Sequence, residues 1–156
     1  MSTREFAAGA SFVLLQVGNR RFGLPAEIVS ELAPPVRLHT FPHTTPLVAG
    51  VIVRRGRIVP VFDVSSILSG KSSFNHRFYL IAQRRAGNTA EASAIPLSGE
   101  CELTTAEMRQ PGDGRAAYVA GLLQIGDETI EVLDFEKLVN SSARQASESA
   151  PAEARP

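Results

Sequence analysis

The histidines and the single cysteine are the residues whose chemistry matters first, because these side chains bind metal ions and act in nucleophilic catalysis. His39 and His43 are four residues apart, but Pro42 lies between them and disfavours the helical turn that would aim both at one metal ion. Cys101 lies in an expected strand between two glutamates, whose charge should raise the pKa of the thiol and weaken it as a nucleophile. We expect no metal site and no catalytic cysteine.

Two adjacent serines beside an aspartate are the other candidate for catalysis. Ser65 and Ser66 follow Asp63, but this spacing also suits the capping of a short helix, in which side-chain oxygens accept backbone hydrogen bonds. The sequence contains no glycine-rich phosphate loop of the Walker or dinucleotide type. These patterns predict no catalytic residue, no cofactor and no enzymatic activity.

A cluster of arginines is the polar feature best suited to binding. Arg54, Arg55 and Arg57 surround Gly56 in one expected turn, and 14 of the 16 basic residues are arginines. The planar guanidinium group forms bidentate hydrogen bonds with carboxylates, so arginine is common in protein interfaces. A codon bias towards arginine explains the overall excess equally well, but it does not explain the concentration at one turn.

The net charge of the chain and its distribution limit the classes of partner that the arginine cluster could bind. Sixteen basic and sixteen acidic residues give a net charge of zero, which disfavours nucleic acid as the main partner. Residues 1–75 nevertheless carry a charge of +4 and residues 76–156 a charge of −4. Such a bipolar molecule favours head-to-tail contacts with a partner of similar build. Alternatively, part of the negative charge belongs to a solvated tail and only keeps the chain soluble.

Length predicts one domain, and the single cysteine, Cys101, which can form no intramolecular disulfide, predicts a reducing compartment. A chain of 156 residues is near the usual size of a single domain. Its start lacks a secretory signal, and no stretch approaches the roughly 20 apolar residues that span a bilayer. We expect a cytoplasmic protein without direct membrane insertion.

Short, β-branched apolar segments separated by turn residues predict strands in both halves of the chain. Expected hairpins join residues 12–17 with 22–25, 48–53 with 58–62, 78–81 with 92–96, and 119–125 with 129–133. Pro60 predicts an edge or bulged strand, because proline lacks a backbone donor. Asp63 is a plausible N-cap for a helical turn that Gly70 would end, and the capping-box spacing of Thr104 and Glu107 predicts a second helical turn.

An internal repeat organises these elements. An offset of 71 residues aligns Glu31 with Glu102, Gly50 with Gly121, Asp63 with Asp134 and many apolar positions. Each half alone would be marginally stable, so two similar β units must share a core or pack face to face. We expect a loose N-terminus at 1–10 and, from its composition of small and charged residues, a disordered tail at 141–156.

The stretch from residue 49 to 64, AGVIVRRGRIVPVFDV, resembles the central signature of the CheW-like family, and similarity extends over residues 12–140. The resemblance implies a mostly β fold with two tandem five-stranded SH3-like β-barrel subdomains that share a hydrophobic core, at about 11–75 and 76–140, with short helical turns. It also implies a non-enzymatic adaptor that couples the cytoplasmic tip of chemoreceptors, the methyl-accepting proteins, to the regulatory domain of a CheA-type histidine kinase. The alternative is a diverged barrel that binds another protein or nucleic acid through the turn at residues 54–57, with Phe41 and Phe62 nearby for base stacking.

The resemblance also suggests site residues. Glu31 and Arg55 match positions involved in coupling, and Val29 and Val51 match apolar strand positions near the groove where a receptor helix docks. The expected coupling surface comprises Glu31, Arg55, Val29, Val51, Arg54 and Arg57, and the expected structural turn residues are Gly50, Gly56 and Asp63.

Two departures from the family pattern concern partner choice. Val53 and Arg54 stand where the family usually has Asn and Leu, and residues 94–98 replace its Val-Asp-x-Val stretch. The second departure removes an acidic position and places Pro96 in a strand. These changes leave the expected fold intact, and they leave open which receptor, kinase and output the chain serves.

Overall fold

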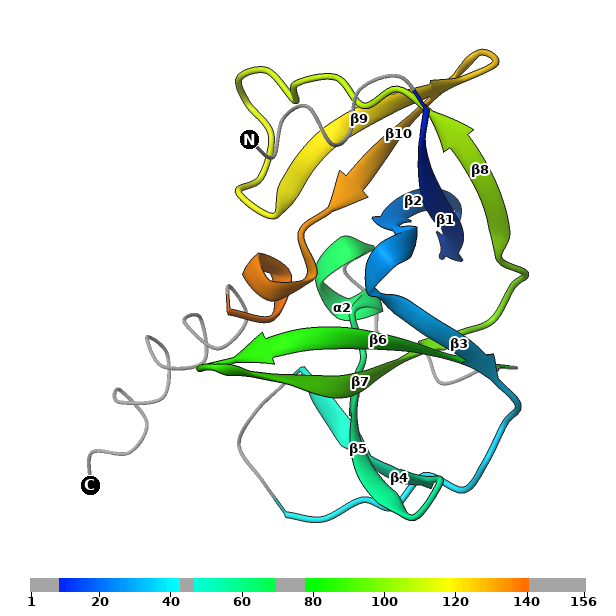
Figure 1. The fold of residues 1–156 in the computed structure, drawn as a ribbon, viewed down its shortest axis with the longest axis vertical. Helices are drawn as coiled ribbons and strands as arrows, with labels where there is room; N and C mark the ends of the chain where they lie inside the picture. Colours follow the sequence, from blue (N-terminus) through cyan, green and yellow to red (C-terminus); the bar gives the residue numbers. More distant parts are fainter. Residues whose placement is uncertain (1–8, 43–46, 70–77, 141–156) are drawn as a thin grey trace.

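A computed structural model describes residues 9–42, 47–69 and 78–140 of the chain. Its strands form two five-stranded sheets, here called sheet A and sheet B, with helical turns between them (Figure 1). The helical elements in this part of the chain are the 3-10 helix η1 (Ala26–Ile28), α2 (Ser65–Leu68) and a turn at 135–140. The expectation of a mostly β fold with two five-stranded units is confirmed.

The two sheets have the same internal order. Sheet A contains β8 (Glu102–Ala106), β1 (Ala10–Val17), β2 (Arg20–Pro25), β10 (Glu128–Leu133) and β9 (Val119–Ile125), in that spatial order. Sheet B contains β3 (Val29–Ala33), β6 (Phe78–Ala86), β7 (Thr89–Leu97), β5 (Arg57–Phe62) and β4 (Val48–Arg54). In each sheet the third and fourth strands are parallel and the other pairs are antiparallel. The repeat seen in the sequence is therefore also a repeat of strand arrangement.

The division of the chain between the sheets differs from the expected one. The strands β1 and β2 lie in sheet A with β8 to β10, whereas β3 to β5 lie in sheet B with β6 and β7 (Figure 1). A tandem division into 11–75 and 76–140 is therefore wrong as a description of the sheets. The reason is local: η1 follows β2 directly and leads the chain into β3 of sheet B, so β8 of the second half completes the β1–β2 hairpin.

The shared core expected from the repeat is present. Its largest apolar cluster includes Phe22 and Leu24 of sheet A, Leu80 and Ile95 of sheet B, and Phe135 of the 135–140 turn. Smaller clusters fill the interior of each sheet, around Phe12, Leu14, Leu123, Ile130 and Val132 in sheet A and around Ala33, Ile52, Val59, Val61, Tyr79, Ile81 and Ala94 in sheet B. Burial of one such large side chain contributes about 1.5–3 kcal/mol, so the shared cluster couples the stability of the two sheets.

The four expected hairpins are confirmed, but the helical turn expected around Glu107 and Met108 from the capping-box spacing is wrong. Thr104 and Thr105 lie in β8, where they pair with Phe12 and Ser11 of β1. The capping-box pattern is a local preference, and pairing with a neighbouring strand overrides it.

The expectation of an edge or bulged strand at Pro60 is also wrong. The strand β5 lies between β4 and β7, and the irregularity of this hairpin lies between Val48 and Gly50 of β4. Val51, opposite Pro60, exchanges both backbone hydrogen bonds with His39, so its polar groups point away from β5. Proline is tolerated at this position because the backbone groups of Pro60 and Val51 form no hydrogen bond with each other.

Several sequence-based expectations lie outside the described residues, namely those on His43, Gly70, residues 1–8 and the tail at 141–156. Within the described ranges, no three His, Cys, Asp or Glu side chains come together as metal ligands. No helix in that part of the chain is long and apolar enough to cross a membrane. Burial, rather than the neighbouring glutamates, raises the pKa of the Cys101 thiol.

Candidate interaction surface

The turn between β4 and β5 presents the three clustered arginines. We call residues Arg54, Arg55, Gly56 and Arg57 the arginine tip. Arg54 pairs with Arg57, and the two turn residues Arg55 and Gly56 have positive φ angles of 53° and 77°. Two positive φ angles are typical of a type I′ hairpin turn, which favours Asn or Gly at its first position. An arginine there costs about 1–2 kcal/mol of backbone strain, so local stability does not explain its presence.

Glu31 orders the arginine tip, although β3 and β4 are the two opposite edge strands of sheet B. The Arg54 guanidinium donates from Nη2 to Glu31 Oε1 at 2.7 Å and from Nε to Oε2 at 3.2 Å, and Arg55 Nη2 donates to Oε1 at 3.3 Å. The hydrogen bonds from Arg54, followed by those from Arg55, lower the pKa of Glu31 to about 2. The carboxylate is therefore ionised at neutral pH and holds both guanidinium groups.

A cavity of about 580 Å³ opens beside this ion pair. Its floor includes Val59 and Ile81 of the sheet B interior, and its rim includes the arginine tip together with Gln83 and Glu91. Gln83 donates a hydrogen bond to Ser30 at 3.0 Å, and Glu91 pairs with Arg84 at 3.4 Å. The surface is a charged rim over an apolar floor, which suits a partner with both kinds of side chain.

Four of the six expected coupling residues gather at this cavity and two do not. Glu31, Arg54, Arg55 and Arg57 line it. Val29 faces the shared core instead. A bulge between Val29 and Glu31 pairs Val29 with Ala82 and Glu31 with Ile81, and these two consecutive residues of β6 point to opposite faces of the sheet. Val51 lies on the outer face of the β4–β5 hairpin, opposite Pro60.

The three expected turn residues have different roles. Gly56 lies in the hairpin turn, as expected. Gly50 does not lie in a turn but inside β4, with a φ angle of 154°, and a Cβ atom there would lie 2.5 Å from the carbonyl oxygen of His39. Asp63 is buried after β5 and accepts hydrogen bonds from the backbone and hydroxyl of Ser65, which starts α2. It is a structural residue, and Ser65 is engaged in the same contact.

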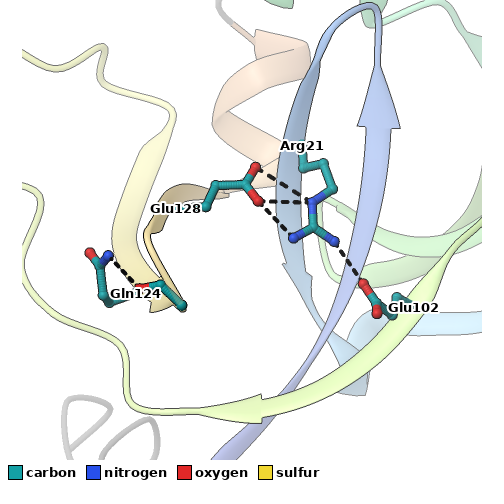
Figure 2. Close-up of polar contacts among 5 residues, drawn as sticks. Arg21, Glu102, Gln124 and Glu128 are labelled. Atoms are coloured by element: carbon teal, nitrogen blue, oxygen red, sulfur yellow. Dashed lines mark hydrogen bonds and ion pairs between the residues drawn. The ribbon is translucent and has the colours of Figure 1, made fainter.

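A second set of ion pairs, which the sequence did not predict, lies on sheet A. Figure 2 shows the Arg21 guanidinium between two carboxylates, with Glu128 at 2.7 Å on one side and Glu102 at 2.7 Å on the other. Hydrogen bonds with Glu128 are the largest cause of the raised pKa of Arg21 and lower the pKa of Glu128. The repeat contained one signal for this cluster, because Glu102 is the equivalent of Glu31.

A smaller cavity of about 210 Å³ lies between the two sheets. Residues of η1 and β6 line one side of it, and residues of β9, β10 and the 135–140 turn line the other. Apolar side chains provide most of its lining, among them Ile28, Met108 and Phe135. It is the apolar counterpart of the charged cavity at the arginine tip.

Comparison with known proteins agrees with this architecture. The family model described as "CheW-like domain" matches residues 11–143. The chain is 29% identical to Protein FrzA of Myxococcus xanthus over 86% of this chain and 88% of that protein. It is 26% identical to Chemotaxis protein CheW of Klebsiella aerogenes over 85% of this chain and 83% of that protein. The crystal structure of scaffolding protein TtCheW from Thermoanaerobacter tengcongensis shares the fold, with a TM-score of 0.71, 18% identity and coverage of 84% of this chain and 88% of that one.

Proposed function

Because the chain belongs to the CheW-like domain family, we propose that it is a non-enzymatic adaptor that couples chemoreceptors to a CheA-type histidine kinase in chemotaxis or a related signalling pathway. The observation that carries the proposal is the arginine tip held by Glu31. Both Glu31 and Arg55 match coupling positions of the family, and the strained Arg55 is 73% exposed while its neighbour Arg54 is only 24% exposed. A strained, exposed cation beside a cavity is better explained by a binding role than by a folding role.

Each of the two cavities suits one partner. We assign the charged cavity at the arginine tip to the regulatory domain of the kinase, because exposed arginines recognise carboxylates with defined geometry. We assign the apolar cavity beside Ile28 to a helix of the receptor tip, since apolar grooves accept the apolar face of an amphipathic helix.

The test is co-migration of the purified protein with the CheA-type kinase and the receptor tip from the same genome. The wild-type chain should bind both, and Arg55→Glu should weaken kinase binding at least about tenfold. Lys137→Glu makes the same charge change at an exposed position in the 135–140 turn, and it should leave kinase binding unchanged. The coupling proposal is wrong if the wild-type chain binds neither partner.

A further inference from the structure

The outer face of the β4–β5 hairpin is apolar and exposed. The cross-strand pairs Val53 with Ile58 and Val51 with Pro60 place these four side chains on one face, which we call the hairpin face. Val53 is 53% exposed and Ile58 is 72% exposed. The opposite face of the hairpin already supplies Ile52 and Val59 to the core of sheet B, so the hairpin face is not needed for that core.

The repeat provides an internal control for this face. The equivalent pair in the β9–β10 hairpin is Gln124 with Thr129. Thr129 donates its hydroxyl hydrogen to Gln124 Oε1 at 2.9 Å. Gln124 Nε2 donates to the carbonyl oxygen of Gly126 at 3.0 Å (Figure 2). The same backbone therefore accommodates a satisfied polar pair. The exposed Val53–Ile58 pair is not a requirement of the hairpin, and exposed apolar side chains grouped in this way mark a contact surface.

The adjoining edge of β4 has unused hydrogen-bonding groups. Val51 exchanges two hydrogen bonds with His39, of 2.8 and 2.9 Å, on the side away from β5. Val53 lies two residues further along β4, so its N–H and C=O groups point to the same side. None of the hydrogen bonds found among the described residues reaches these two groups. An edge with free backbone groups beside an apolar pair is suited to the addition of an extended segment.

Charge defines the chemistry of that segment. The arginine tip contains three guanidinium groups and has one carboxylate partner, Glu31. Arg57 is exposed, and no ion pair within the described ranges includes it. Arg54 and Arg57 project on the opposite side of the hairpin from Val53 and Ile58, because neighbouring strand residues alternate. An added strand would therefore meet apolar side chains on one of its faces and positive charge on the other.

We propose that the β4 edge at Val53 binds an extended acidic segment of a partner protein, in which apolar residues that cover Val53 and Ile58 alternate with carboxylates that pair with the arginine tip. This contact goes beyond the coupling function proposed above. It specifies backbone pairing with a segment of defined pattern, and it can be tested without a kinase or a receptor.

The test is a titration of the full-length ¹⁵N-labelled chain with a synthetic peptide of alternating valine and glutamate. Methylation of every second peptide nitrogen leaves one hydrogen-bonding edge and prevents association beyond a dimer. The amides of Val53 and its β4 neighbours should shift on binding, and the matched valine–lysine peptide should bind at least about tenfold more weakly. The proposal is overturned if the valine–glutamate peptide shifts no β4 amide, or if the lysine peptide binds equally well.

Two double variants provide the test and its control, because each gives one hairpin the residue pair of the other. Val53→Gln with Ile58→Thr copies the polar pair of sheet A, so the fold is expected to survive and peptide affinity to fall at least about tenfold. Gln124→Val with Thr129→Ile changes the equivalent sheet A pair and should leave the affinity at β4 unchanged. Unchanged binding by the first double variant overturns the proposal. A single-stranded RNA that shifts the same amides, when the acidic peptide does not, assigns the edge to nucleic acid and also overturns it.

Discussion

The hairpins β4–β5 and β9–β10 occupy equivalent places in the two sheets, yet their tips carry opposite charge. One tip reads Arg54, Arg55, Gly56 and Arg57, and the other reads Ile125, Gly126, Asp127 and Glu128. At the first turn position Gly126 has a φ angle of 61°, and Arg55 has nearly the same angle, 53°, with a side chain that disfavours it. The two turns therefore share a left-handed backbone at their first position. They differ at the second, since Gly56 has a φ angle of 77° and Asp127 does not have a positive φ angle.

The equivalent glutamates show the same divergence. Glu31 is held by two arginines of its own sheet's hairpin tip, whereas Glu102 shares Arg21 of β2 with Glu128. The sheet A carboxylates thus tie β8 and β10 to β2, and Glu31 orders two arginines, of which Arg55 is 73% exposed. In sheet A one arginine thus pairs with two carboxylates, whereas in sheet B one carboxylate pairs with two arginines.

The largest expected effect concerns the exchange of strands between the two halves. Neither residues 1–75 nor residues 76–156 should fold alone, because each sheet takes strands from both halves. Each fragment should give a disordered amide NMR spectrum, and mixing the two should restore the dispersed spectrum of the intact chain. A dispersed spectrum from either fragment alone would contradict the exchange.

Substitution of the equivalent glycines should distinguish the two edge strands. Gly50→Ala places a Cβ atom 2.5 Å from a backbone oxygen, at a positive φ angle, and should destabilise the protein by roughly 2–4 kcal/mol. Gly121→Ala places a Cβ atom against the flexible side chain of Met108 and 2.8 Å from the carbonyl oxygen of Arg109, but the φ angle of Gly121 is not positive. Urea unfolding should therefore show a smaller loss of unfolding free energy for Gly121→Ala than for Gly50→Ala. Equal losses would show that the close approach of the His39 carbonyl is not the cause.

Lowering the pH should change the stability contributions of the two ion-pair clusters by different amounts. Since the pKa of Glu31 is lowered from 4.5 to about 2, its stabilising contribution is fully present above about pH 4.5 and is lost as the pH falls towards 2. The difference in unfolding free energy between wild type and Glu31→Gln should shrink over that range. Glu128→Gln, at the carboxylate paired with Arg21, should show a smaller change. The assignment fails if the Glu31→Gln difference is independent of pH.

The smallest expected effect tests the strain at Arg55. Both Arg55→Gly and Arg55→Ala remove the exposed ion pair with Glu31, but only glycine relieves the positive φ angle. The glycine variant should be more stable than the alanine variant by about 1 kcal/mol in thermal or urea unfolding. An alanine variant of equal or greater stability would show that the turn is not strained.

Local patterns predicted the hairpins well, because glycine and charged turn residues separate short apolar runs in this sequence. The repeat also predicted a shared core. It could not predict which strands complete which sheet, since the path of the chain after Pro25 depends on η1, a helix of three residues with a weak local signal. For the same reason the helical turn expected from the capping-box spacing was wrong: the pairing of Thr104 with β1 joins residues far apart in the chain.

The candidate site was predicted in part. Clustering in the sequence identified Arg54, Arg55 and Arg57, and the repeat together with the family resemblance identified Glu31. The direction of Val29 was missed, because a one-residue bulge reverses the face of a strand and leaves little trace in composition. Whether an apolar strand residue is exposed, as Val53 and Ile58 are, depends on the neighbouring elements and required the structure.

Receptor-dependent autophosphorylation of the CheA-type kinase tests the coupling role most directly. With receptor tip and kinase held constant, addition of the wild-type chain should raise the phosphorylation rate, Lys137→Glu should raise it equally, and Arg55→Glu should lose at least about nine-tenths of the increase. No increase with the wild-type chain, or an undiminished increase with Arg55→Glu, would contradict the account of the arginine tip as the coupling surface.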